Sequence, residues 1–337
     1  MLNPSKTLFF MMLVLGTLIS IMSNSWPATW MGLEINLLAF IPLMYNKNNI
    51  MSSEASMKYF VIQAMASSAF LTFILISYIL PDLNKLIEEL MHTLISATLM
   101  IKMGAAPFHL WFPMVMEGLS WINCLILMTW QKLAPIAIIS YLNCQYQFLY
   151  FIIISSILVG SIGGLNQTSI RKIMAYSSIN HIGWMMMAMT VSEMLWQIYF
   201  IIYSILTTTL MIIFMNSSNS IINQFTFKSY SQKIKLAVML NMMSLGGLPP
   251  FLGFLPKWMV IQSTSDQNIF MIIFMVSFTL ITLFYYLQLA MSSYLLNSST
   301  LKWNYQQILF KNNNVIMIFT SISLFSLPLY ALLMYSL

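Results

Sequence analysis

Four ionisable side chains, Glu34, Lys102, Lys132 and Lys257, lie inside long apolar stretches of this sequence. The remaining charges lie in or beside polar connecting stretches. Placing a charged side chain at the centre of a bilayer costs about 3 kcal/mol on insertion scales, and groups retained there commonly mark an ion or proton path. One carboxylate and three amines that can exchange protons therefore predict a proton relay.

Glutamate and lysine suit such a relay because each can change the proton affinity of the other. Burial disfavours an ammonium group and lowers its pKa, whereas a nearby carboxylate raises that pKa again. A glutamate–lysine pair whose separation changes can therefore take up and release a proton near neutral pH. Moving one charge through a potential of 100 mV requires about 2.3 kcal/mol, and a pKa change of about two is of matching size.

The composition is that of a membrane protein: 59% of the 337 residues are hydrophobic and 7% are charged. Soluble domains carry about 25% charged residues, so a soluble globular enzyme is excluded. The apolar runs are about 20 residues long, which is the length of a membrane-crossing helix and too long for β-barrel strands. Because lipid cannot hydrogen-bond the backbone, these runs predict an all-α, polytopic membrane protein.

The apolar runs predict eleven transmembrane helices joined by short loops. They lie at about residues 7–23, 26–45, 56–80, 89–108, 119–141, 147–168, 172–190, 195–215, 235–263, 268–295 and 314–336. We treat the chain as one integral membrane domain, divided into a first half at 1–168, a second half at 169–290 and a C-terminal helix region at 291–337. These short loops leave no room for a nucleotide, flavin or iron–sulfur site.

When eleven spans are assumed, the charged residues outside the four intramembrane ones divide unequally between the two faces of the membrane. Loops on the side of the N-terminus carry ten basic and two acidic residues, and loops on the other side carry one basic and five acidic residues. Basic residues concentrate on the cytoplasmic or matrix side of membrane proteins. We therefore expect the N-terminus on that side and the C-terminus on the opposite one. No basic run exceeds two residues, so nucleic-acid binding is not expected.

The fourth and ninth spans carry one pattern at the same spacing. Residues 104–113 read GAAPFHLWFP, and residues 247–256 read GLPPFLGFLP. Matching positions are Gly104 with Gly247, Pro107 with Pro250, Phe108 with Phe251 and Pro113 with Pro256, at an offset of 143. Because proline removes an intrahelical hydrogen bond, both spans are expected to break within the membrane. Paired broken helices in two halves indicate a transporter built from inverted repeats, although proline kinks alone could produce this match by chance.

Each candidate residue also has a structural interpretation. Glu34 could be a buried carboxyl that only joins two helices, and Lys102 or Lys132 could extend to the interface along its alkyl stem. Lys257 would be an ordinary interfacial lysine if the ninth helix ended at Pro250. His181, in the middle of the seventh span, could be either a relay group or a hydrogen-bonding core residue.

Several long motifs resemble one known family. They are WMGLEINLLAFIPLM at 30–44, EASMKYFVIQAMAS at 54–67, KMGAAPFHLWFPMVMEGLSW at 102–121, MTWQKLAP at 128–135, LNQTSIRKIMAYSSINHIGWM at 165–185 and LNMMSLGGLPPFLGFLPKW at 240–258. Together they are similar to the subunit 2 family of mitochondrial NADH:ubiquinone oxidoreductase, respiratory complex I. Members of that family are antiporter-like subunits of the membrane arm.

The resemblance implies a proton channel with a broken-helix lysine in each half, joined by a hydrophilic axis at mid-membrane. The family's helix glutamate falls on Glu34, its lysines fall on Lys102, Lys132 and Lys257, and a polar position of the central axis falls on His181. The first half would be shorter at its N-terminus than in bacterial relatives.

The resemblance also implies where the chain works and with what. The chain would lie in the mitochondrial inner membrane with its N-terminus facing the matrix, among lipids and other membrane-arm subunits, including neighbouring antiporter-like subunits. It would bind no cofactor itself, because NADH, FMN, iron–sulfur clusters and ubiquinone belong to other subunits. Proton movement in this chain would be driven by electron transfer elsewhere in the complex.

Two other functions remain open from the residues. A stand-alone cation/proton antiporter can use the same broken-helix lysines, although a Na⁺ site would favour more buried carboxylates than Glu34. A structural membrane subunit without transport would use the buried charges only to pack its helices.

Overall fold

The structure is a computed structural model of the chain and describes residues 4–46, 48–79, 85–142, 145–217, 232–265, 268–295 and 320–321. The described residues are predominantly α-helical, which confirms the predicted all-α class. The chain divides into two compact units, Met1–Ser155 and Ser156–Leu337, and the boundary falls within helix α8 (Tyr146–Ile162). The division that the sequence analysis places at residue 168 stays a prediction.

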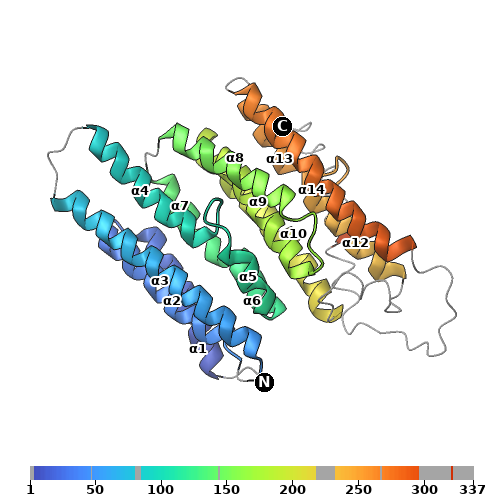
Figure 1. Cartoon of the computed structure of the whole chain (residues 1–337), viewed down its shortest axis with the longest axis horizontal. Helices are drawn as coiled ribbons and strands as arrows, with labels where there is room; N and C mark the ends of the chain where they lie inside the picture. The colour runs from blue at the N-terminus through green and yellow to red at the C-terminus, as the bar shows by residue number, and fades with distance from the viewer. Residues whose placement is uncertain are drawn as a thin grey trace. The chain divides into compact units, whose positions relative to one another are not determined.

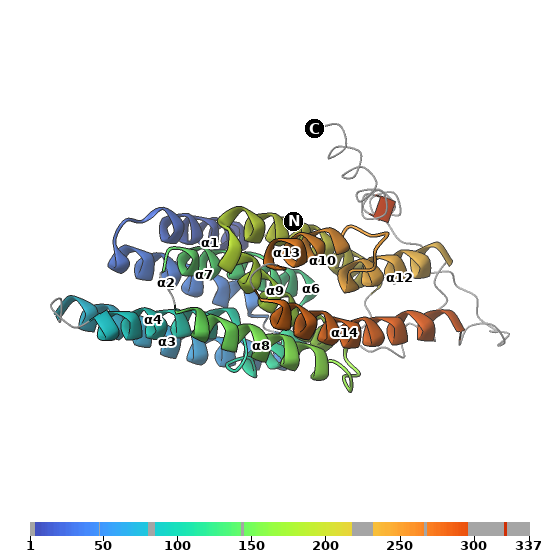
Figure 2. The ribbon, with the colours of Figure 1, turned by 90° about the horizontal axis from the view of Figure 1, so that it is seen from above.

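The first unit is a bundle of helices that run alongside one another (Figures 1 and 2). Its helices are α1 Pro4–Met22, α2 Trp26–Met44, α3 Ile50–Ile79, α4 Lys85–Met103, α5 Trp111–Gly118, α6 Trp121–Met128 and α7 Trp130–Ser140. The pair α1 and α2 is held at backbone contact distance by glycines. A Cβ built on Gly16 would lie 2.8 Å from the backbone nitrogen of Asn36, and one on Gly32 would lie 2.6 Å from that of Ser20. Small residues allow this close approach, which favours helix association in membranes.

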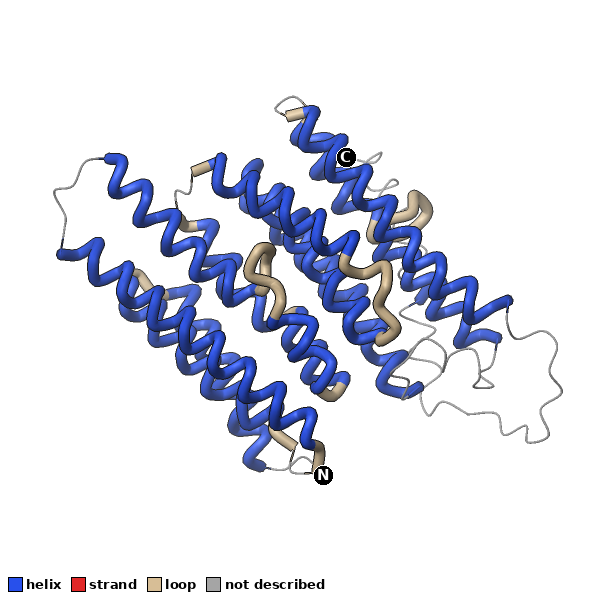
Figure 3. The backbone as a smooth tube through the Cα atoms, viewed as in Figure 1, coloured by secondary structure: helices blue, strands red, loops and turns tan. Residues whose placement is uncertain are grey.

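The predicted break in the first unit is a stretch of non-helical backbone between α4 and α5 (Figure 3). Gly104 has a φ of 74°, in the left-handed region that glycine adopts without strain. Its N–H donates to the carbonyl of Ile101, and the N–H of Ala105 donates to the carbonyl of Met100. This pair of bonds is the Schellman arrangement that ends helices at a left-handed glycine.

The second unit contains α9 Ile170–Val191, α10 Glu193–Ser217, α12 Gln232–Gly246, α13 Phe254–Thr264 and α14 Ile269–Leu295. Its break lies between α12 and α13 and begins at Gly247, which has a φ of 82°. The N–H of Gly247 donates to the carbonyl of Ser244, and the N–H of Leu248 donates to the carbonyl of Met243. The second unit therefore ends its interrupted helix with the same Schellman arrangement.

The helix bounds reproduce the sequence repeat on both sides of each break. Helix α4 ends at Met103 and α12 ends at Gly246, while α5 begins at Trp111 and α13 begins at Phe254. Both pairs are separated by 143 residues, the offset of the sequence motif. Pro113 and Pro256 accordingly take the third position of α5 and α13, in the first helical turn, where a backbone N–H would have no intrahelical partner.

Six segments among the described residues are long and apolar enough to cross a membrane, judged by length and composition. They are Pro4–Met22, Trp26–Met44, Ile50–Ile79, Trp121–Ser140, Glu193–Asn216 and Ile269–Met291. Each falls on an expected span. The full count of eleven stays a prediction: α8 and the described part of α12 are shorter, and the eleventh expected span lies outside the described residues except for 320–321.

Candidate functional site

Glu34 and Lys102 lie within electrostatic range of one another in the first unit. Lys102 lies in the last turn of α4 and is buried, whereas Glu34, on α2, is partly buried. The Glu34 carboxylate lies within electrostatic range of the Lys102 ammonium. The ammonium also lies 5.8 Å from the centre of the Phe70 ring, a distance at which an ammonium is attracted to an aromatic face. The structure thus brings the carboxylate within electrostatic range of one of the predicted lysines.

The carbonyl end of α4 is satisfied by two side chains that the sequence analysis did not identify. Gln63 of α3 donates through Nε2 to the carbonyl oxygen of Lys102 at 3.2 Å. Trp111 donates through Nε1 to the carbonyl oxygen of Ile101 at 3.1 Å. Because the last carbonyls of a helix have no intrahelical donor, these bonds stabilise the break beside Lys102. A polar Gln63 within the apolar third span is the sequence signal that could have found one of them.

Lys132 lies on α7 and is almost fully buried, at 1% exposure. Its ammonium lies 5.2 Å from the centre of the Phe112 ring on α5, the far side of the break. The helix is irregular on both sides of Lys132. Thr129 separates α6 from α7, and Pro135 cannot donate to the carbonyl of Gln131. Lys132 is therefore held in locally distorted backbone.

A direct side-chain bond joins the helix of Glu34 to the helix of Lys132. Gln131 donates through Nε2 to Oδ1 of Asn36 at 3.0 Å, and both side chains are buried. Asn36 lies two residues after Glu34 on α2. Helix α4, which carries Lys102, packs against α7. Glu34, Lys102 and Lys132 therefore lie on α2, α4 and α7 of the first unit. Helix α4 packs against α7, and the Asn36–Gln131 bond joins α7 to α2.

Lys257 is the buried lysine of the second unit, at 5% exposure. It lies on α13 and donates through Nζ to the carbonyl oxygen of Gly246 at 2.8 Å. Its ammonium also lies 5.8 Å from the centre of the Trp184 ring. A Cβ built on Gly247 would lie 2.9 Å from Lys257 Cδ, so the lysine occupies the space that this glycine leaves. These contacts bury the Lys257 ammonium at the break of the second unit.

His181 lies in the middle of α9 and is buried. Its Nδ1 is 2.9 Å from the hydroxyl of Tyr199 on α10, and its ring lies 4.9 Å from that of Tyr203, measured between ring centres. Trp184, which faces Lys257, is three residues after His181 and therefore near the same face of α9. This arrangement fits both interpretations of His181, as a relay group and as a hydrogen-bonded core residue.

The two breaks hold their lysines on opposite sides of the interruption. Lys102 precedes Gly104 on the first half-helix, and Lys257 follows the break on the second half-helix and reaches back to the first. Lys102 belongs to the last turn of α4, and the Lys257 ammonium binds a carbonyl at the end of α12; this end of a helix carries a partial negative charge. The helix end therefore favours the protonated lysine, and a movement that separates the two would favour release of the proton.

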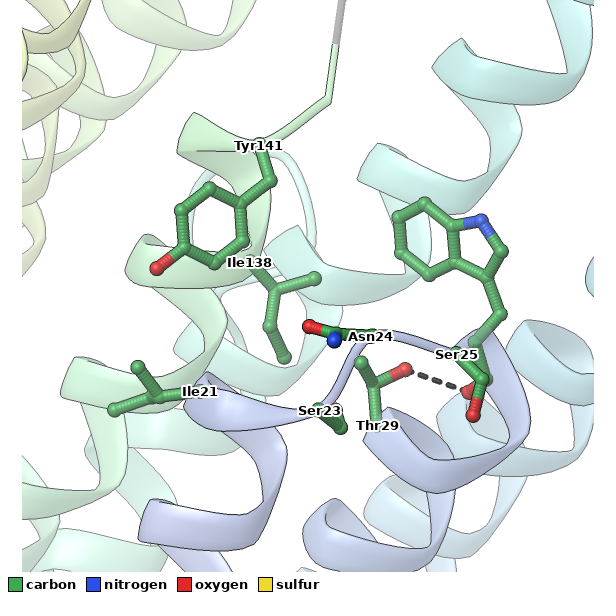
Figure 4. Close-up of a pocket in the computed structure, with 8 residues that line it drawn as sticks. Ile21, Ser23, Asn24, Ser25, Thr29, Ile138 and Tyr141 are labelled. Atoms are coloured by element: carbon green, nitrogen blue, oxygen red, sulfur yellow. Dashed lines mark hydrogen bonds between the residues drawn. The ribbon is translucent and has the colours of Figure 1, made fainter.

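A pocket of about 440 Å³ lies elsewhere in the first unit, where α1 joins α2 and α7 ends. Figure 4 shows Tyr141 and Ile138 across from Asn24, Ser25 and Thr29. None of the predicted relay residues lines it. Among the described residues, no three His, Cys, Asp or Glu side chains gather as metal ligands.

Comparison with known proteins identifies the family to which the chain belongs. Residues 23–282 match the model for the transmembrane NADH:quinone oxidoreductase/Mrp antiporter family. The chain is 53% identical over 313 residues to NADH-ubiquinone oxidoreductase chain 2 of Anopheles gambiae, across 92% of this chain and 90% of that protein. The chain belongs to this family. The chain 2 protein of Dugong dugon is 38% identical over 305 residues, across 87% of this chain and 88% of that protein.

Solved structures share the fold at lower sequence identity. A chain of respiratory complex I from Thermus thermophilus has a TM-score of 0.84 at 21% identity, across 96% of this chain and 78% of that one. A chain of the Mrp complex from Dietzia sp. has a TM-score of 0.79 at 15% identity, across 96% and 75%. The antiporter-like membrane fold expected from the sequence is confirmed.

Proposed function

We propose that the chain is a core membrane subunit of respiratory complex I that carries protons across the inner membrane through Glu34 and the buried Lys102, Lys132, His181 and Lys257. Relatives at up to 53% identity are named NADH-ubiquinone oxidoreductase chain 2, so the chain acts as part of an oxidoreductase complex. Its own residues move protons, while NADH oxidation, flavin, iron–sulfur and ubiquinone chemistry take place in other subunits.

The observation that carries this proposal is the repeated helix break with a buried lysine at its carbonyl end. A structural role would not require two units to interrupt a helix with the same Schellman arrangement, 143 residues apart. Nor would it require a buried ammonium at each interruption, because a buried ion pair or ion is costly compared with an apolar side chain. The recurrence of both features favours proton transport over packing alone.

In the first unit, Glu34 controls the proton affinity of Lys102. When the carboxylate lies close to the ammonium, their attraction holds the proton on Lys102. Withdrawal of Glu34 removes this attraction, and Lys102 then gives up its proton. Lys132, on α7 against α4, is the acceptor that we assign to this step. Its position over the Phe112 ring stabilises the protonated form once it is made.

In the second unit, the proton on Lys257 is stabilised by the Gly246 carbonyl and the Trp184 face. His181 lies on the same helix as Trp184 and can take or give a proton at either ring nitrogen. We assign Lys257 and His181 to the proton path of this unit. Electron transfer in the rest of the complex would supply the energy that changes these contacts.

We place the N-terminus on the matrix side, which carries the lysine-rich loops, and the C-terminus on the intermembrane-space side. Partners are neighbouring membrane-arm subunits, including antiporter-like ones, and lipids. The outer face of α1 supports contact with lipids or a neighbouring subunit, because large apolar side chains are exposed at intervals of three or four residues. They are Met11, Leu15, Leu18 and Met22.

The test is proton pumping by the assembled complex in proteoliposomes, with variants Lys102→Ala, Lys132→Ala and Lys257→Ala. We expect each to reduce the number of protons moved per NADH oxidised at least threefold. Lys58→Ala is the matched control, because Lys58 is half exposed on α3 and pairs with the adjacent-turn Glu54 in an exposed ion pair at 3.6 Å. Pumping at the control level by all three buried-lysine variants would refute the relay and favour a structural subunit.

A further inference from the structure

The proton step of the first unit depends on two helices that the break separates. Lys102 lies on α4, before the break, whereas Lys132 contacts Phe112 on α5, after it. Residues 104–110 between α4 and α5 are not helical, so no continuous ladder of helical hydrogen bonds fixes α5 relative to α4. Displacing a reacting group by about 1 Å can slow a reaction about 100-fold. The relay therefore needs contacts that hold the two half-helices across the break.

Trp111 makes such a contact. It is the first residue of α5 and is buried. Its Nε1 donates to the carbonyl oxygen of Ile101 at 3.1 Å, ten residues back along the chain and on the other side of the break. Ile101 directly precedes Lys102. Because the indole is rigid and has a single N–H donor, this bond fixes the start of α5 relative to the backbone that carries the Lys102 ammonium.

The indole ring of Trp111 also packs against the ring that faces Lys132. Its centre lies 5.4 Å from that of Phe112, with an angle of 76° between the two planes, an edge-to-face geometry in which aromatic rings attract. The Phe112 ring centre lies 5.2 Å from the Lys132 ammonium. Phe112 also packs against the break, since a Cβ built on Gly104 would lie 3.0 Å from its side chain. Trp111 is thus linked to Lys132 through one intervening ring.

Two further buried rings hold Trp111 against neighbouring helices. Tyr59 of α3 lies 5.8 Å from Trp111, and Phe40 of α2 lies 5.3 Å from Tyr59, both measured between ring centres. Tyr59 is four residues before Gln63, so both side chains lie on the same face of α3. Gln63 binds the carbonyl of Lys102. One face of α3 therefore supports both the end of α4 and the indole that joins it to α5.

We propose that Trp111 is a positioning residue of the relay, which holds Lys102 and Lys132 in the one arrangement that lets a proton pass between them. Its N–H acts on Lys102 through the Ile101 carbonyl, and its ring acts on Lys132 through Phe112. A displacement of the end of α4 is therefore transmitted to Lys132. This inference rests on the proposed function, which assigns the two lysines as donor and acceptor.

Trp111 takes no part in the proton transfer itself. One proton leaves Nζ of Lys102 and one proton arrives at Nζ of Lys132, while the indole keeps its own proton on Nε1 throughout. No electron moves, so no oxidant or reductant is needed. The role of Trp111 therefore depends on the bond from its N–H and on the contacts of its ring, which substitutions can remove separately.

The experiment compares Trp111→Phe with the control Trp196→Phe in the assembled complex, reconstituted in proteoliposomes. Phenylalanine keeps an aromatic ring and removes the N–H donor. Trp196, on α10, is similarly buried, and its N–H has no hydrogen-bond partner among the described residues. We expect Trp111→Phe to lower the number of protons moved per NADH oxidised at least twofold and Trp196→Phe to leave it unchanged. Equal values for the two variants would overturn the proposal.

Combination with Lys102→Ala separates positioning from a merely structural role. If Trp111 acts through the relay lysines, Trp111→Phe should cause no further loss of pumping once Lys102 is absent. A residue that only stabilises the fold would lower pumping by the same factor with or without Lys102, because the two losses would then be independent. That result would overturn the positioning role.

Substitutions of Tyr59 decide the question even if Trp111→Phe does not assemble. Tyr59→Leu removes the ring that supports Trp111 and leaves the indole in place, whereas Tyr59→Phe keeps that ring. We expect Tyr59→Phe to move at least twice as many protons per NADH as Tyr59→Leu. Equal pumping by the two variants would show that the aromatic support of Trp111 is not needed, and would overturn the proposal.

The single lysine variants distinguish failure of this inference from failure of the relay. If Lys102→Ala and Lys132→Ala pump poorly while Trp111→Phe matches Trp196→Phe, the positioning role is refuted and the relay stands. If both lysine variants pump normally, the proton step of the first unit is refuted, and the positioning role fails with it.

Discussion

Gln63 of α3 donates a hydrogen bond to the backbone carbonyl of Lys102, so the helix that breaks is held by a side chain from its neighbour. The bond satisfies a carbonyl that the end of α4 leaves without an intrahelical donor. It also fixes the backbone that carries the Lys102 ammonium. The position of Lys102, within electrostatic range of Glu34, therefore depends on α3 as well as on α4.

Replacing Gln63 with leucine removes this donor and keeps a side chain of similar size. We expect a loss of about 1–3 kcal/mol, because the buried carbonyl is left without its donor. Thermal dissociation of the purified complex, followed by native gel electrophoresis, measures the effect. Ser68→Ala on the exposed face of the same helix is the control. Equal midpoints for the two variants would show that the carbonyl finds another partner.

Gly247→Ala tests the contact between the second break and its lysine. The added Cβ would lie 2.9 Å from Cδ and 3.1 Å from Nζ of Lys257, and the left-handed φ of 82° costs a non-glycine residue about 1–2 kcal/mol. We expect the ammonium to leave the Gly246 carbonyl and pumping to fall as far as in Lys257→Ala.

Gly104→Ala is the matched variant of the first break. Its φ is also left-handed, but the added Cβ would meet the Phe112 side chain at 3.0 Å and would affect a relay lysine, Lys132, only through that ring. We therefore expect comparable loss of thermal stability with a smaller loss of pumping. If both glycine variants lose stability and pumping in the same proportion, the effect on Lys257 is merely a consequence of misfolding.

The Asn36–Gln131 bond predicts coupling between the helices of Glu34 and Lys132. Removing one partner leaves the other buried and unsatisfied, whereas removing both leaves an apolar contact. We expect Asn36→Leu and Gln131→Leu each to destabilise the complex, and the double variant to lose less than the sum. Polar pairs between membrane helices contribute about 0.6 kcal/mol on average. Strict additivity in a double-mutant cycle of thermal midpoints would show that the bond contributes nothing.

The sequence predicted the features of this fold that have a strong local pattern. Long apolar runs indicated helices, and glycine and proline at Gly104, Pro107, Gly247 and Pro250 indicated the breaks, which begin in the structure at the two glycines. Pro107 and Pro250 lie within the non-helical stretches. A buried charge such as Lys102 is also conspicuous in an apolar helix.

Features that depend on which helices meet could not be predicted. Gln63 and Trp111 are single polar or amphipathic residues, and nothing in their spacing shows that both donate to the end of α4. Tyr199 and Tyr203 beside His181 could not be predicted either, because aromatic residues are common throughout an apolar sequence. Helix α4 ends at Met103, inside the predicted fourth span, because the left-handed Gly104 ends the helix before Pro107 does.

The orientation of the chain can be tested by single cysteines on either side of α2. Asn24 lies in the exposed turn between α1 and α2, and Asn49 lies in the exposed segment before α3. Because α2 separates the two positions, a membrane-impermeant maleimide should reach them from opposite sides. We expect Asn49→Cys to react only in inside-out vesicles and Asn24→Cys only in mitoplasts, in a background in which both native cysteines, Cys124 and Cys144, are replaced by serine. The reverse pattern would place the lysine-rich loops in the intermembrane space and overturn the proposed location of the N-terminus on the matrix side.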